Sequence, residues 1–145
     1  MFAPINYTAS ATLTAYEANA VTTVNAAAGL TLTLPAATGT GRRYDIILGT
    51  TVTSNSVIIK VASATDWMAG NIWVATDNAS DVTIAFETAT GALASRSDTI
   101  TLNGTTTGGV AGDRFTLIDL ASGQWGITGW TSATGTEVTP FSAAV

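Results

Sequence analysis

The segment Leu30–Leu34, which reads LTLTL, decides the fold class of this chain. Successive side chains of an extended backbone point to opposite faces, so the three leucines share one face and the two threonines share the other. Alternation of this kind is typical of a β-strand with one buried face. The same pattern recurs in YDIIL (44–48), SVIIKV (56–61), VTIAF (82–86), DTITL (98–102), RFTLIDL (114–120) and QWGITGW (124–130).

Weaker alternation extends this reading to the segments 12–16, 21–24 and 72–75, and turn-forming residues separate the segments. No stretch has a convincing helical period. The pattern therefore predicts an all-β fold: an antiparallel sandwich, jelly roll or barrel of about eight to ten short strands with almost no helix. We expect one domain over 11–145, preceded by an N-terminal arm at 1–10.

The composition argues against several classes of partner. Charged residues make up only 10% of the 145 residues, against a usual share of roughly 25%. With a net charge of −5 and five cationic side chains, the chain is poorly suited to bind a phosphate backbone, so we expect no nucleic-acid partner. A basic amphipathic segment and a long apolar run are both missing from the sequence, so we expect no membrane partner.

The chain has no cysteine and no histidine. This excludes disulfides, thiol nucleophiles, Cys/His zinc sites and histidine-based triads. We therefore predict that the protein is not an enzyme and uses neither a cofactor nor a metal. Chemistry by carboxylates alone stays open. However, five of the ten acidic residues stand at predicted strand ends or turns, where they cap the local backbone: Asp66, Asp77, Asp81, Asp98 and Asp113.

Two groups of apolar residues are candidates for contact with a partner. The first is the uncharged N-terminal arm, with Phe2, Ile5 and Tyr7. The second is Trp67 and Trp73, which flank MAGN, a predicted loop, and could lie on a partner surface or stack on sugar rings. Of the other tryptophans, Trp125 is in phase with Ile127 and is predicted to lie in the core, whereas Trp130 is out of phase with Trp125.

The glycine-rich stretch TTTGGVAGD (105–113) resembles a ligand-binding loop only at first sight. A phosphate-binding loop needs a following Lys and a helix, but RFTLIDL follows here and is predicted to be a strand. We therefore predict a hairpin connection between DTITL and RFTLIDL, with Asp113 capping the return. If this uncharged loop is ordered, we expect a neighbouring subunit or a larger assembly to hold it.

Two stretches carry a family resemblance: Leu13–Leu48, through its part AAAGLTLTLPAATGTGRRY (26–44), and SDTITLNGTTTGGVAGDRFTLIDLASGQWGITGW (97–130). The first resembles the strand–proline–turn–strand module of tailed-phage virion proteins, and the second resembles the closing meander of the same modules. A small, acidic, cysteine-free β protein of this kind is similar to a capsid decoration (cement) protein. The resemblance carries no residue-level site with it.

Several expectations follow from that resemblance. It implies a structural protein on the outer capsid surface of a virion, which stabilises the shell by bridging subunits of the major capsid protein. It also implies a homo-oligomer, most commonly a trimer. The alternative is a head-fibre or tail-associated receptor-binding β domain that recognises a host glycan through Trp67 or Trp73. A hydrolase that uses only carboxylates is a third hypothesis.

Overall fold

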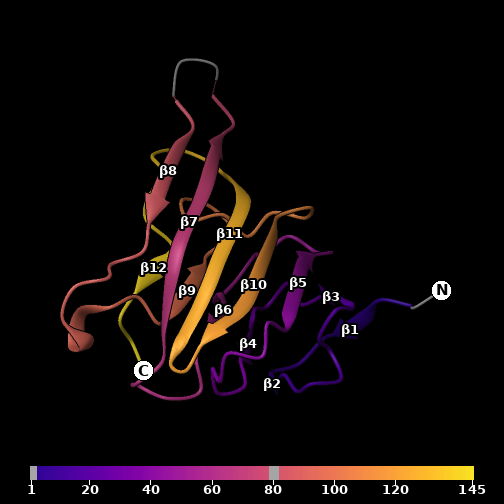
Figure 1. The fold of residues 1–145 in the computed structure, drawn as a ribbon. Helices are drawn as coiled ribbons and strands as arrows, with labels where there is room; N and C mark the ends of the chain where they lie inside the picture. The colour runs from indigo at the N-terminus through magenta and orange to yellow at the C-terminus, as the bar shows by residue number, and fades with distance from the viewer. Residues whose placement is uncertain (1–2, 79–81) are drawn as a thin grey trace.

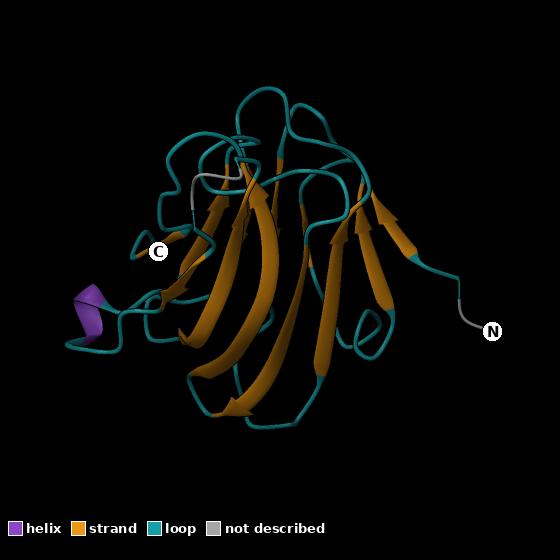
Figure 2. Ribbon diagram, turned by 90° about the horizontal axis from the view of Figure 1, so that it is seen from above, coloured by secondary structure: helices purple, strands orange, loops and turns teal. Residues whose placement is uncertain are grey.

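The computed structural model describes residues 3–78 and 82–145. Two β-sheets pack face to face with the apolar core between them (Figures 1 and 2). The prediction of an all-β sandwich is confirmed. The one helical element in the described ranges is a short 3₁₀ turn, η1 (Leu93–Ser95), which projects from the side opposite the N-terminus.

The larger sheet has seven strands, and β1 and β8 form its edges. In spatial order these strands are β1 (Ile5–Tyr7), β3 (Val21–Val24), β5 (Arg43–Leu48), β10 (Arg114–Ala121), β11 (Gln124–Ala133), β7 (Trp67–Thr76) and β8 (Ile84–Glu87). The smaller sheet has five strands. In spatial order they are β12 (Phe141–Ser142), β9 (Thr99–Leu102), β6 (Val57–Lys60), β4 (Leu30–Thr33) and β2 (Ala11–Thr12).

The first six strands form a parallel coil. The odd-numbered strands lie in the large sheet and the even-numbered strands in the small one, so the chain crosses the core after every strand. Each strand therefore runs in the same direction as the strand that precedes it in the same sheet, two strands earlier in the chain. The pairs β1–β3, β3–β5, β2–β4 and β4–β6 are parallel, as is β7–β11. The expectation of an antiparallel architecture is wrong for this half, and both sheets are mixed.

Alternating side chains from the two sheets fill the core, as the sequence pattern predicts. Leu30, Leu32 and Leu34 are all buried, and the intervening threonines are half-buried. The ring of Trp125 meets that of Tyr44 edge to face, with centroids 5.6 Å apart. The pattern of VTIAF (82–86) is the exception: Val82 and Ile84 are exposed, because β8 is an edge strand that extends past the sandwich with β7 (Figure 1).

Within the segment expected as an arm, Ile5–Tyr7 forms strand β1 and pairs in parallel with Thr22–Val24 of β3. Tyr7 packs against the core, and its hydroxyl donates a hydrogen bond of 2.6 Å to Oε1 of Glu17. Ile5 is half-buried. This part of the N-terminal segment is therefore built into the edge of the large sheet.

The glycine-rich loop connects the two sheets and is not a hairpin, because β9 lies in the small sheet and β10 in the large one. Asp113 holds the loop: its Oδ2 accepts hydrogen bonds from the amides of Gly109 (2.7 Å) and Val110 (3.0 Å). Asn103 Oδ1 accepts two further hydrogen bonds, from the amides of Thr105 and Thr107. The predicted capping role of Asp113 is confirmed, and hydrogen bonds within the chain hold both ends of the loop.

Candidate functional site

The outer face of the large sheet carries one row of directly paired residues that stands out chemically. Ile47 on β5 lies beside Arg114 on β10, Arg114 lies beside Trp130 on β11, and Trp130 lies beside Trp73 on β7. Their positions alternate with core positions on the same strands, so all four side chains point away from the core. The row places an arginine and two tryptophans next to one another on the surface.

Trp73 and Trp130 form a stacked aromatic pair with ring centroids 5.6 Å apart and 17° between the ring planes. Trp73 is 40% exposed and Trp130 is 52% exposed, although they contact each other. Much of the indole surface of both residues is therefore open to a binding partner. Trp and Arg are the residues that most often dominate binding energy at protein surfaces.

A polar cluster lies on β10 and β5, the next two strands of the sheet after β11 on the side away from β7. Arg43 Nε donates to both carboxylate oxygens of Asp45, at 2.9 and 2.8 Å, and the Thr116 hydroxyl donates to Asp45 Oδ1 at 2.6 Å. Arg43 and Asp45 thus form an ion pair on the outer face of the sheet. Burial opposes ionisation of Asp45, but the hydrogen bonds from Arg43 and Thr116 outweigh it, and the pKa of Asp45 is lowered.

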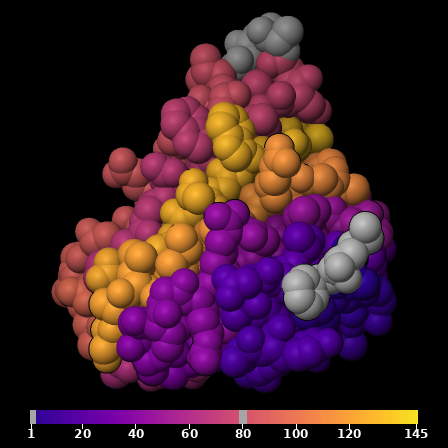
Figure 3. All heavy atoms as spheres, turned by 45° about the vertical axis from the view of Figure 1, so that its right-hand side comes forward, coloured from indigo at the N-terminus to yellow at the C-terminus, as the bar shows by residue number. Residues whose placement is uncertain are grey.

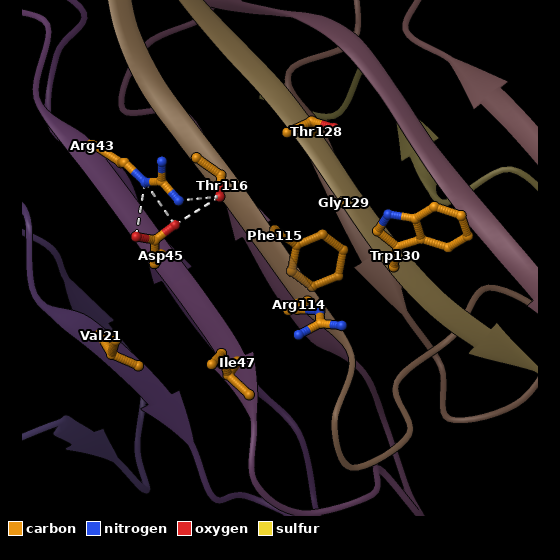
Figure 4. A pocket seen from close by; sticks show the side chains of 10 residues that line it. All are labelled: Val21, Arg43, Asp45, Ile47, Arg114, Phe115, Thr116, Thr128, Gly129 and Trp130. Carbon is orange, nitrogen blue, oxygen red and sulfur yellow. Dashed lines mark hydrogen bonds and ion pairs between the residues drawn. The ribbon is translucent and has the colours of Figure 1, made fainter.

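An open cavity of about 290 Å³ lies between this polar cluster and Trp130 (Figure 4). Thr128 and the backbone of Gly129 lie between the two sides, and the Phe115 ring packs beneath Gly129, where a side chain would otherwise stand. Figure 4 shows the indole nitrogen of Trp130 on the cavity side of its ring. Two arginines (Arg43 and Arg114) and one aspartate line the cavity, a local charge of +1 in a chain of net charge −5.

A second hollow, of about 580 Å³, lies at the N-terminal corner, which we define as residues 3–5 with 15–20. Its lining contains no charged residue. Tyr16 is 80% exposed there, and Ile5 brings the edge strand β1 to the same place. Figure 3 shows the N-terminal segments, coloured indigo, gathered on one side of the molecule. The lining of this hollow is thus uncharged and mostly apolar, and it lies beside an open sheet edge.

The structure separates the residues that the sequence marked as partner-binding. Ile5 lines the hollow at the N-terminal corner, Tyr7 packs against the core, and Phe2 lies outside the described residues. Trp67 and Trp73 do not flank a loop, because β7 runs through both of them without interruption. Trp67 is half-buried beneath the guanidinium of Arg96, which lies 4.5 Å from its ring centroid, so that it offers less open surface than Trp73.

Sequence reasoning missed Trp130 and Arg114 as site residues. The signal was present in each case: Trp130 is out of phase with Trp125, and Arg114 is out of phase with Phe115. A residue out of phase with core residues on the same strand points to the outer face. The pairing of β11 with β7, which brings Trp130 to Trp73, joins distant segments and leaves no local signal.

Buried carboxylates serve as clamps on the loops. Asp119 accepts hydrogen bonds from the amides of Thr38, Gly39 and Thr40, at 2.7–3.0 Å, and from two threonine hydroxyls. Asp98 accepts hydrogen bonds from the backbone amides of Ala144 and Val145, and Asp66 accepts one from the amide of Ala37. Backbone amides thus donate hydrogen bonds to each of these three carboxylates.

The pKa values of these clamps follow from their surroundings. Burial opposes ionisation of Asp119 and Glu17, but their hydrogen bonds outweigh it, so the pKa of each is lowered. For Asp113, burial outweighs the backbone hydrogen bonds, so its pKa is raised. Burial, together with the hydrogen bond to Glu17 and its charge, raises the pKa of Tyr7 to about 12. Each shift is explained by a structural contact.

Three further observations bear on function. The described ranges contain no group of three or more acidic, histidine or cysteine side chains placed to hold a metal ion. Within the same ranges, no helix has the length and apolar character required to cross a membrane. Comparison of the chain with family models, curated proteins and solved structures finds no match.

Proposed function

We propose that this protein is a structural component of a phage virion that decorates the outside of the capsid and stabilises it by bridging subunits of the major capsid protein. The observation that carries the proposal is the N-terminal corner, where the exposed Tyr16 and the edge strand β1 surround a hollow without charged residues. An apolar patch of this kind, next to a polar surface, is typical of a protein-binding site. The resemblance of 26–44 and 97–130 to modules of phage virion proteins favours a capsid as the partner.

The fold is well suited to such a role. Five buried carboxylates clamp loops onto a rigid sandwich: Glu17, Asp66, Asp98, Asp113 and Asp119. A rigid body that binds only the assembled shell stabilises it by mass action, because dissociation of the shell must also release the decoration. Under this proposal the protein performs no catalysis, and it assembles on the shell as a homo-oligomer, with a trimer favoured.

The proposal is tested with capsids assembled from the major capsid protein of the same genome. We expect the purified protein to co-sediment with these capsids in a saturable manner and to raise the temperature at which they dissociate. The variants Tyr16→Ser and Ala15→Asp remove the exposed ring or place a charge in the hollow, and both should weaken co-sedimentation by roughly tenfold or more. Both positions are exposed, so folding should be preserved.

Leu93→Ser and Ala94→Asp are the controls, because they likewise remove a large apolar side chain or introduce a charge at exposed positions of η1, on the side opposite the N-terminus (Figure 2). They should bind capsids as the unchanged protein does. A lack of saturable co-sedimentation by the unchanged protein would overturn the proposed function. Equal binding by the corner variants and the controls would overturn the corner as the docking surface. Light scattering of the bound and free protein tests the trimer.

A further inference from the structure

We propose that the cavity beside Trp130 binds a carboxylated sugar residue, of the uronic or sialic acid type, on the outer face of the large sheet. This site is separate from the N-terminal corner and goes beyond the proposed function, so that each can fail without the other. Sequence reasoning connected glycan recognition with Trp67 or Trp73. The geometry points instead to Trp130 and Arg114, with Trp73 as the residue that holds Trp130 in place.

The carboxylate of the sugar is assigned to Arg114. This guanidinium is exposed, and in the described part of the chain it has neither an ion pair nor a hydrogen bond. Its cross-strand neighbour Trp130 presents the indole N–H on the cavity side (Figure 4). A planar guanidinium suits a carboxylate, because it can donate paired hydrogen bonds to the two carboxylate oxygens. The local charge of +1 favours the same ligand over a cation.

The opposite wall of the cavity favours a sugar over an acidic peptide or a phosphate. Asp45 is an acceptor that repels a second negative charge but can accept a hydrogen bond from a hydroxyl group. It accepts three hydrogen bonds, two from Arg43 Nε and one from the Thr116 hydroxyl, whereas a carboxylate has about four acceptor positions. The Thr128 hydroxyl lies on the same surface. The groups that can bind sugar hydroxyls, Asp45 and Thr128, thus lie across the cavity from Arg114, which can bind the carboxylate.

The dimensions of the site suit one sugar ring. Asp45, Thr116 and Thr128 form one cross-strand row, and Ile47, Arg114 and Trp130 form the next. Each row spans two strand spacings, about 10 Å, and the rows are two residues apart, about 7 Å. The volume of about 290 Å³ is at the lower end of that of small-molecule sites. The indole surface that Trp73 leaves uncovered can pack against the C–H face of the ring.

The test uses the full chain labelled with ¹⁵N, with the indole N–H signal of Trp130 as the reporter. Methyl glucuronide and N-acetylneuraminic acid are the carboxylated probes, and methyl glucoside is the neutral one. We expect saturable shifts with at least one carboxylated probe at millimolar concentration, and affinity roughly tenfold lower for the neutral sugar. Arg114→Gln should remove this preference. Arg96→Gln, a matched loss of an arginine that lies against a different tryptophan, should leave it unchanged.

Three results would overturn the inference. The first is no saturable shift with either carboxylated probe. The second is equal weakening by Arg114→Gln and Arg96→Gln, which would show a response to overall charge. The third is tighter binding of a short polyglutamate peptide than of both carboxylated sugars, which would reassign the cavity to an acidic protein partner. Capsid co-sedimentation of Arg114→Gln should equal that of the unchanged protein, and this keeps the two proposals distinguishable.

Discussion

Trp73 and Trp130 are direct cross-strand neighbours on the parallel pair β7 and β11, and their indole rings stack 5.6 Å apart. The two residues come from distant parts of the sequence, and only this pairing brings them together. Because Trp73 contacts Trp130 on the side of β7, it restricts the indole that lines the cavity on the side of β10. The stack therefore connects the stability of the sheet with the shape of the candidate site.

We predict that the two tryptophans are energetically coupled. Trp73→Ala, Trp130→Ala and the double variant, compared by urea unfolding, should give a coupling free energy of about 0.5–1.5 kcal/mol, the range of aromatic pairs. Trp73→Ala combined with Val21→Ala is the control. Val21 is also exposed on the outer face, but β3 is four strands away from β7. The prediction fails if both cycles give the same coupling.

The sequence predicts which residues face the core far better than it predicts which strands pair. Alternation at Leu30–Leu34 and at Phe115–Leu117 depends only on neighbouring residues, and the structure confirms it. Pairing depends on where the chain travels between strands. Successive crossings of the core make β1, β3 and β5 parallel, and the same alternation would also fit an antiparallel hairpin arrangement.

Gly70 explains why the sequence predicts a loop between Trp67 and Trp73, where the structure has a continuous strand. The stretch MAGN looks like a loop because Gly and Asn commonly end strands. In the structure Gly70 lies inside β7 with φ at +141°, and a Cβ at this position would stand 1.9 Å from the carbonyl oxygen of Ile127. The glycine marks a close approach of two backbones, a contact that only the tertiary structure reveals.

Gly70→Ala is therefore predicted to destabilise the protein by more than about 4 kcal/mol, since backbone atoms of β11 would have to move. Gly41→Ala is the control, because Gly41 also has a positive φ, +71°, but open space around it. That variant should lose only about 1–2 kcal/mol, a decrease in melting temperature of a few degrees. Thermal unfolding followed by circular dichroism measures both. Equal losses would show that backbone strain, and not the close approach, controls Gly70.

Asp119→Ala is predicted to cost about 2–4 kcal/mol of unfolding free energy. The carboxylate is buried and accepts three amides and two hydroxyls from the turn Thr38–Thr40, so removing it leaves these donors without a partner in the protein. Asp77→Ala removes an exposed carboxylate and should change stability by less than about 0.5 kcal/mol. Urea unfolding of the two variants at pH 7 checks the difference. Hydrogen exchange at the Thr38–Thr40 amides should accelerate in Asp119→Ala alone.

Acid is predicted to destabilise the fold through the same carboxylates. The folded-state pKa values of Asp119, Glu17 and Asp45 are lowered from their ordinary values of 3.8, 4.5 and 3.8. Their contribution is therefore fully present above these ordinary values and is lost as the pH falls through the lowered ones. The pKa of Asp113 is raised, so protonation of this one group opposes the loss.

With three lowered groups against one raised group, we expect the unfolding free energy to be nearly constant from pH 7 to pH 5 and to fall below about pH 4. Urea unfolding at several pH values measures this curve. Asp119→Asn keeps one acceptor oxygen but cannot titrate, so its curve should start lower at pH 7 and fall less steeply below pH 4. A variant curve parallel to that of the unchanged protein would contradict the assignment of acid sensitivity to Asp119.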